Sequence, residues 1–443
     1  MGKIRKMYLC IIISGISLNM FAQGNEPMQL SLNRACQLAV DSNLQIINAR
    51  IEIQKTHYQE QETKSKLYPT LSGYSNFNYN YAIPQMVIPG EIFGETGEIP
   101  VQIGTKYDWS SGFDASISLV NLSNLTAIKL AKSMKAMSTL TLEQKKEEIL
   151  YQVHQVYFLC QATNTQITYL GKNMENTNRL LEILDNQIKN GIARRIDYSN
   201  VTVTKNNLEN QIENLEKLEN QQKNLLKYIL GLDIKIPIEL TDSLTNDGSQ
   251  NYSLPDFSVG IDVTLIDNQL DIARLNKKST SQGYLPTLSA FGQFYYQAQQ
   301  NKFNFFDGNN RFSQVGVVGL SLNIPIFDGF EKQNKIRQYN SEIAQLQNTR
   351  KNTINELQKE YANAVLEYTN SLKSIQRQQD NIKVAEENYT ISLQQYKQQK
   401  LLLSDLMLAE NSLTEARLSY VDALLQLKNA ELELKKLNNK LYK

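Results

Sequence analysis

Two aspartates occupy the same place in two similar stretches of the chain, and their carboxylates are the first candidates for functional side chains. Asp197 follows a turn near Gly191, and Asp405 follows a second turn 208 positions later. Carboxylates crowded at a constriction would favour cations and raise one another's pKa. The competing interpretation is a solvated aspartate that begins a helix. Because both stretches carry the residue at the same place, we favour a functional role for the pair.

The sequence holds no recognisable set of residues for catalysis or for metal binding. His57 and His154 are the only histidines, and both are isolated. No Ser-His-Asp set, Cys-His pair, paired catalytic carboxylates or glycine-rich phosphate loop stands out. Lys plus Arg number 46 against 45 for Asp plus Glu, so charge gives no case for nucleic acid as a partner. We therefore expect no enzyme, no cofactor and no metal.

Two stretches with a seven-residue apolar repeat position the aspartates. Residues 123–230 and 329–437 each have the pattern of a very long helix, a sharp turn and a shorter helix. Two rows offset by three or four residues predict a coiled-coil seam. In the first stretch, one row is Val153, Cys160, Ile167, Met174, Leu181 and Ile188, and the other is Ile149, Val156, Thr163, Leu170, Thr177 and Leu184. At about 1.5 Å per residue, the longer helices would reach roughly 100 Å.

The second stretch pairs large side chains with small ones. Tyr396 ends an apolar row on the long helix. Packing in the seam is therefore the strongest alternative to any functional role for this residue. On the return helix the large row is Leu406, Leu413, Tyr420, Leu427 and Leu434, and the small row is Ala409, Ala416, Ala423 and Ala430. The alanines would let a partner helix approach closely.

Four other stretches alternate with a period of two. Residues 70–82, 106–120, 287–299 and 311–324 are predicted to be strands with one apolar and one polar face. The connections 82–105 and 301–310 are expected to be loops. Aromatic residues at the strand ends would suit the aromatic girdle of a sheet inserted in a membrane, and they are Tyr79, Tyr81, Tyr107 and Trp109.

The order of elements predicts two internal repeats. Residues 23–230 and 262–443 each give a helix, two strands and a helical hairpin, and residues 231–261 form a connector between them. Leu67 to Ser72 matches Tyr284 to Ser289, apart from one swapped pair. Residues 1–22 combine basic residues with a short apolar run, which is typical of a cleaved signal peptide. We therefore expect an exported protein.

Exported chains with amphipathic strands of about ten residues are typical of outer-membrane barrels. Four strands cannot close a barrel, and an open sheet edge is not tolerated in lipid. Two chains would give eight strands, whose interior is filled by side chains. Three chains would give 12 strands with room for a conduit, so we predict a homotrimer in outer-membrane lipid whose polar helices extend into the periplasm. The alternative is a periplasmic coiled-coil adaptor or scaffold without a pore, which would explain the hairpins but not the strands.

These features resemble the TolC family of outer-membrane factors, the trimeric channel-tunnels of efflux pumps and type I secretion systems. Three motifs carry the resemblance: Leu-Pro-Thr-Leu at 285–288, Leu-Asn-Ile-Pro-Ile-Phe-Asp-Gly at 322–329, and Asn190-Gly191-Ile192 followed by Asp197. The resemblance implies a mainly α fold with membrane β, in which a shared 12-stranded β-barrel continues into a coiled-coil α-barrel. It also implies a passive channel that docks on an inner-membrane pump through a periplasmic adaptor, or membrane fusion protein.

The resemblance further assigns roles at the periplasmic tip. It implies a gate or constriction made of Asp197, Asp405 and Tyr396, in which Asp197 bonds Tyr396 on a neighbouring helix and helps to lock it. Four residues of the two turns would face the docking partners, and they are Gly191, Ile192, Gln398 and Gln399. In three places the chain departs from the family pattern. Gln399 stands where family members often have glycine, and Leu408 stands where an acidic residue is common. The helix expected before Pro286 is about one heptad shorter than its counterpart in the first repeat.

Overall fold

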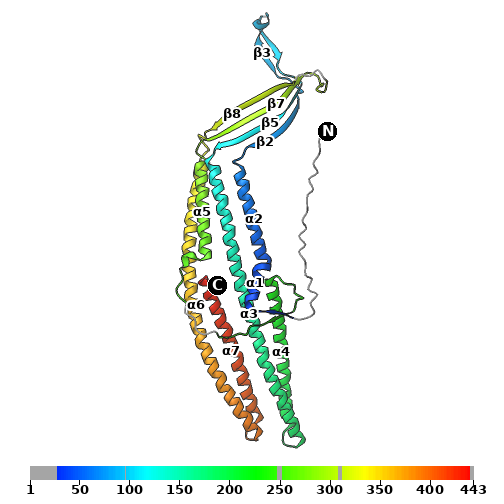
Figure 1. The fold of residues 1–443 in the computed structure, drawn as a ribbon, viewed down its shortest axis with the longest axis vertical. Helices are drawn as coiled ribbons and strands as arrows, with labels where there is room; N and C mark the ends of the chain where they lie inside the picture. The colour runs from blue at the N-terminus through cyan, green and yellow to red at the C-terminus, as the bar shows by residue number, and fades with distance from the viewer. Residues whose placement is uncertain (1–26, 95, 247–251, 308–311, 440–443) are drawn as a thin grey trace, which may run out of the picture.

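The computed structural model describes residues 27–94, 96–246, 252–307 and 312–439. The molecule is elongated, with helices along its long axis and a β-sheet at one end (Figure 1). The expected signal peptide, residues 1–22, lies outside the described residues. Within those four ranges, no helix has both the length and the apolar character of a membrane span.

Two helices of almost equal length form the axis of the helical body. They are α3 (Leu122–Lys189, 68 residues) and α6 (Glu331–Lys397, 67 residues). Each returns through a tight turn into a shorter antiparallel helix, α4 (Arg195–Leu230) or α7 (Leu403–Leu437). The α3 row that runs from Ile149 to Leu184 is buried throughout. The hydroxyls of its two threonines donate hydrogen bonds to the backbone carbonyls four residues earlier. These polar side chains therefore need no water in the seam.

Three shorter helices pack beside the two long helices. Helices α1 (Leu32–Ser42) and α2 (Leu44–Ser65) lie along the upper part of α3, above α4, and α5 (Ile261–Gln282) lies along α6 above α7 (Figure 1). Asn43 separates α1 from α2. The Asn43 side chain accepts from the amides of Gln45 and Ile46 and donates to the carbonyl of Ile229 at 2.7 Å. One residue therefore caps α2 and ties it to the end of α4.

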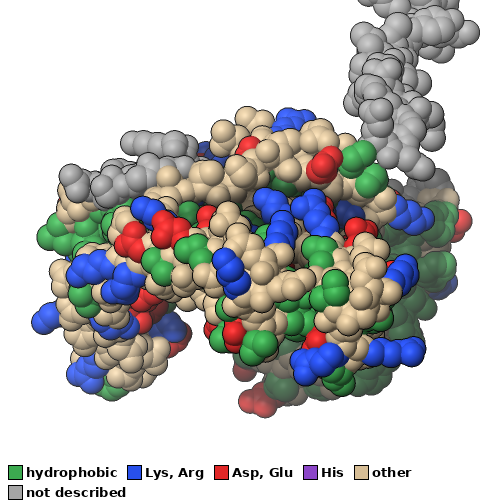
Figure 2. Space-filling model, turned by 90° about the horizontal axis from the view of Figure 1, so that it is seen from below, with side chains coloured by type: hydrophobic (Ala, Val, Ile, Leu, Met, Phe, Trp, Pro, Cys, Tyr) green, Lys and Arg blue, Asp and Glu red, His purple; other side chains and the backbone are tan. Residues whose placement is uncertain are grey.

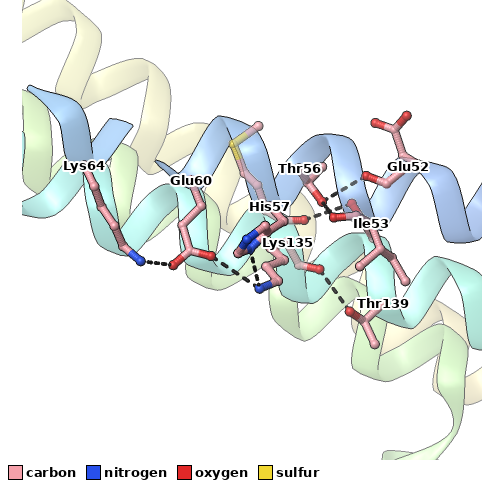
Figure 3. Close-up of polar contacts among 10 residues, drawn as sticks. Glu52, Ile53, Thr56, His57, Glu60, Lys64, Lys135 and Thr139 are labelled. Atoms are coloured by element: carbon pink, nitrogen blue, oxygen red, sulfur yellow. Dashed lines mark hydrogen bonds and ion pairs between the residues drawn. The ribbon is translucent and has the colours of Figure 1, made fainter. Parts of the chain in front are cut away.

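A charged network also joins α2 to α3 (Figure 3). Glu60 lies 2.7 Å from Lys64 on its own helix and 3.5 Å from Lys135 on α3. The Lys64 hydrogen bond and the charges of both lysines hold the pKa of Glu60 below its usual range. Lys135 also lies 3.1 Å from Nδ1 of His57. In the described part of the chain, no group of three or more His, Cys, Asp or Glu residues could hold a metal ion.

The sheet at the upper end has four antiparallel strands in the order β2-β5-β7-β8. They are β2 (Thr70–Tyr79), β5 (Tyr107–Val120), β7 (Thr287–Gln300) and β8 (Ser313–Asn323). The register pairs Phe77 with Trp109 on one face, and Asp114 with Gln293 on the other. One face of the sheet is therefore mainly apolar and the other mainly polar, as the alternation predicts.

The prediction of a plain loop over 82–105 is wrong. Residues Gln85–Pro89 (β3) and Glu98–Gln102 (β4) pair as an antiparallel ribbon, with a 3₁₀ turn at Gly90–Phe93 between them. The ribbon projects beyond the sheet at the far end of the molecule (Figure 1). The prolines and glycines of this stretch hide a strand signal only five residues long.

The middle of the molecule holds a compact core. The three-residue strands β1 (Met28–Leu30) and β6 (Ile238–Leu240) pair in parallel there, and no strand was predicted in either place. The Tyr157 hydroxyl donates to the carbonyl of Leu30 at 2.9 Å and lies 3.0 Å from an Asp242 carboxylate oxygen. That same carboxylate oxygen accepts from the amide of Leu32, and so stabilises the start of α1.

Candidate functional site at the ends of the helical hairpins

The two hairpin turns have the same hydrogen-bonded structure. Each is a Schellman motif in which one residue takes a left-handed backbone conformation, Gly191 with φ 70° and Gln399 with φ 60°. In both turns, the amide after this residue donates to the carbonyl five positions earlier. The four bonds run from Gly191 to Ile188, from Ile192 to Gln187, from Gln399 to Tyr396 and from Lys400 to Gln395.

The second turn carries strain that the first does not. Glycine adopts the left-handed conformation without penalty, whereas Gln399 has a Cβ atom that opposes it. Gln399 stands where the family pattern often has glycine, and its backbone is left-handed in the structure. Gln398, the residue before it, caps α6 with φ −87° and is exposed.

Tyr396 joins the two hairpins just above these turns. It is buried in an apolar cluster with Leu180 and Leu184 of α3, Val201 of α4 and Leu406 of α7. Its hydroxyl lies 3.4 Å from Oε1 of Gln187, a weak hydrogen bond across to α3. Burial, and after it the charge of Asp197, raises the pKa of Tyr396. Gln187 is a partner that the sequence analysis missed.

Asp197 lies beside Tyr396 but has a partner of its own. Its side chain is only 17% exposed, and both carboxylate oxygens lie 3.1 Å from the guanidinium of Arg194. The ion pair raises the pKa of Arg194. Asp197 and Tyr396 line a groove of about 930 Å³, together with Ile192 and Gln399. The structure therefore brings together four of the predicted tip residues.

Asp405 lies in a different setting. It is exposed, and it lines a second groove of about 710 Å³, between α6 and α7, where Leu408 is a neighbour. Leu402 is the N-cap residue of α7 where Arg194 is the N-cap residue of α4, so Asp405 lacks the ion pair of its counterpart. Its carboxylate accepts a long hydrogen bond, of 3.5 Å, from the Ser404 hydroxyl. The two aspartates thus share a position on the chain but differ in charge compensation.

Figure 2 looks onto this end of the molecule. Basic, acidic and apolar side chains are interspersed over the surface rather than gathered by sign. Gly191 and Ile192 are both exposed at the first turn. The tip therefore offers mixed polar and apolar contacts instead of a strong single-sign field.

The predicted aromatic residues lie at the opposite end, where the strands end. Tyr79 and Tyr107 are neighbours with ring centroids 5.1 Å apart, whereas Tyr81 lies beyond β2 and is 91% exposed. Trp109 packs edge-on against Phe305 and also contacts two more phenylalanines. These three partners of Trp109 were not expected from the sequence, because 301–310 was predicted to be a simple loop. Phe305 and Phe306 fall within that loop, and Phe312 lies just after it.

Comparison with known proteins identifies the family. The model of the outer membrane efflux protein family matches residues 35–232 and 267–440. No curated protein sequence matches the chain. The outer membrane protein VceC from Vibrio cholerae superimposes with a TM-score of 0.75 at 15% identity, over 92% of this chain and 96% of that one.

Two further solved structures share the fold. CusC gives a TM-score of 0.75 at 16% identity, over 92% of this chain and 91% of its own. The MtrE outer membrane channel of Neisseria gonorrhoeae gives a TM-score of 0.73 at 15% identity, over 93% of this chain and 89% of its own. At these identities the structures establish the fold, and the family match establishes membership. The chain belongs to the outer membrane efflux protein family, and it is an outer-membrane exit channel for efflux rather than an enzyme.

Proposed function

We propose that three copies of the chain form the passive exit duct of a tripartite efflux pump or a type I secretion system, gated at its periplasmic tip. Each copy supplies four strands to a 12-stranded β-barrel in the outer membrane. The helices continue the conduit into the periplasm as a coiled-coil α-barrel. A periplasmic adaptor and an inner-membrane pump supply the energy and the substrate.

The observation that carries the proposal is the incomplete sheet. Among the described residues, β2 and β8 each have a hydrogen-bonded neighbour on one side only. A sheet with an apolar face and two open edges is not stable in lipid, because its edge amides and carbonyls have no partners there. Joining β8 of one copy to β2 of the next satisfies both edges at once. The two hairpin turns, with matching bonds, also support the proposal of two internal repeats.

The gate rests on the groove between the hairpin ends. Tyr396 and its contact with Gln187 fasten α6 to α3. Asp197 lines the same groove, from which its carboxylate would bond Tyr396 on the neighbouring helix and help to lock the gate. Asp405 carries an uncompensated charge and would give the constriction its preference for cations. The exposed turn residues Gly191, Ile192, Gln398 and Gln399 are the proposed docking surface for the adaptor.

Two adjacent residues of β8 test the membrane arrangement. Val318 lies on the apolar face and is 90% exposed, whereas Val317 lies on the polar face opposite Gln293. Val318→Lys would put a charge into lipid, at a cost of about 2–4 kcal/mol near the bilayer centre. Val317→Lys would point into the aqueous lumen and serves as the matched control.

The measurements are outer-membrane fractionation, followed by light scattering of the detergent-extracted protein. We expect the parent and Val317→Lys to be trimers in the outer membrane, and Val318→Lys to be depleted from it. A stable folded monomer, or equal tolerance of both lysines, would contradict the shared barrel. A periplasmic scaffold, the alternative function, would instead wash off the membrane with salt.

A further inference from the structure

One carboxyl group is buried in the seam between the two hairpins, above the tip cluster. Glu410 of α7 is only 8% exposed, and its Oε1 has no hydrogen-bond partner among the described residues. The Asn176 side chain of α3 lies close enough to the carboxyl group to lower its pKa. A buried carboxylate without a cation is costly, because ionisation removes a charge from water without compensation.

The polar side chains nearest Glu410 are already engaged. The Thr414 hydroxyl donates to the backbone carbonyl of Glu410 at 3.0 Å and accepts from the Asn173 amide at 2.7 Å. Tyr389 of α6 faces the same region, and burial together with the Glu410 charge raises the pKa of Tyr389 to about 12. None of these groups supplies a positive charge.

The nearby cations are directed elsewhere. The guanidinium of Arg417 on α7 lies 2.7 Å from Glu386 of α6 and 5.6 Å from the centre of the Tyr169 ring. Arg179 on α3 is exposed, and its charge acts on Tyr389. Burial raises the pKa of Glu410 to about 7, against an ordinary value of 4.5, and the Asn176 side chain only partly opposes this.

We propose that Glu410 is a proton-operated joint between α7 and α3, which holds the hairpins together when uncharged and loosens them when ionised. The position of Glu410 supports this role. It lies one turn beyond Leu406, which belongs to the apolar cluster around Tyr396. The Thr414 hydroxyl, which bonds the Glu410 carbonyl, also links α7 to Asn173 of α3. Loosening here would release α7 from α3 next to the proposed gate. The conductance part of the inference therefore rests on the proposed function, whereas the stability part does not.

The direction of the pH dependence follows from proton binding. The folded chain holds the Glu410 proton more tightly than the unfolded chain, so the joint is strongest below about pH 4.5. That stabilisation is lost progressively as pH rises through about 7. Over this range the equilibrium constant for keeping the seam closed should fall on the order of 100-fold.

The test uses the intact, detergent-purified protein and the neutral variant Glu410→Gln. Hydrogen exchange of the α7 amides should accelerate in the parent between pH 5 and pH 8, after correction for intrinsic exchange, and should show no such excess in Glu410→Gln. Glu387→Gln is the matched control, because Glu387 is an exposed glutamate of α6 and its loss changes net charge equally. An equal pH response in the parent and Glu410→Gln would overturn the joint. If Glu410→Gln fails to assemble, Glu410→Met provides a second uncharged side chain of similar length.

Planar-bilayer recordings test the link to opening. The parent should open more often at pH 8 than at pH 5.5, whereas Glu410→Gln should stay at the low opening frequency at both. A pH response of α7 exchange without any change in opening would overturn the coupling of the joint to the gate. A protein that forms no channel at any pH would instead count against the proposed function.

Discussion

The left-handed conformation of Gln399 should lower the stability of the second hairpin turn by a measurable amount. A residue with a Cβ atom loses roughly 1–2 kcal/mol in this conformation. Gln399→Gly removes the penalty, and the greater freedom of glycine in the opened turn offsets about 0.5 kcal/mol of the gain. The net stabilisation of the turn should be about 1 kcal/mol, which corresponds to a roughly five-fold change in an equilibrium constant.

Amide hydrogen exchange of Lys400 reports this change, because its amide donates to the Gln395 carbonyl at 2.9 Å and is released when the turn opens. In Gln399→Gly, exchange at Lys400 should slow roughly five-fold. Gly191→Ala is the reciprocal change: φ is 70° and no atom lies within 4 Å of the new Cβ, so any loss comes from the backbone alone. Exchange near the first turn should then accelerate.

Gln398→Gly is the matched control. Gln398 has φ −87°, which any residue tolerates, so glycine offers no relief there and should slow nothing. Equal slowing in Gln398→Gly and Gln399→Gly, or no slowing in either, would refute the explanation by backbone strain.

Four further substitutions probe the helical body and the tip. Ala423 is buried in the seam, whereas Ala416 lines an open groove. Ala423→Leu should therefore lower the free energy of unfolding by about 1–3 kcal/mol, and Ala416→Leu by much less, as measured by thermal unfolding. Equal losses of stability in the two variants would mean that a neighbouring copy fills that groove. Asp405→Asn should weaken cation preference in planar bilayers with little change in opening, and unchanged selectivity would exclude this acidic ring as the constriction. Tyr396→Phe should raise basal conductance and sensitivity to vancomycin by removing the hydroxyl bond to α3, and an unaltered channel would leave Tyr396 with a packing role alone.

The long helices and the main strands could be predicted from the sequence because each repeats a simple period over many residues. The row from Ile149 to Leu184 keeps a seven-residue spacing, and it is the row that the structure buries. The alternation near Phe77 and Trp109 likewise places both residues on one face of the sheet. Such periods follow from helix and strand geometry alone.

Elements that depend on distant partners could not be predicted in the same way. β3 and β4 have only five residues each, and β1 and β6 three, so no period can develop before the pairing itself exists. At the tip, the positions of the two aspartates follow from spacing, but the Gln187 contact depends on how two hairpins are rotated about each other. Glu410 did leave a signal, since it stands four residues after Leu406 and three before Leu413, on the side of the helix that carries the large row.

The pairing of β1 with β6 has a consequence for the order in which the chain folds. Met28 pairs with Ile238, so the first described strand waits for more than 200 residues before its partner exists. Contacts between residues so distant in sequence form slowly, because the chain loses the entropy of closing the intervening loop before the contacts can stabilise it. The α3–α4 hairpin, a local structure, would form first and present the Tyr157 hydroxyl as a hydrogen-bond donor for the Leu30 carbonyl. A chain that ends before residue 238 should therefore build the hairpin yet leave α1 undocked, which makes the middle of the molecule the last part of this half to assemble.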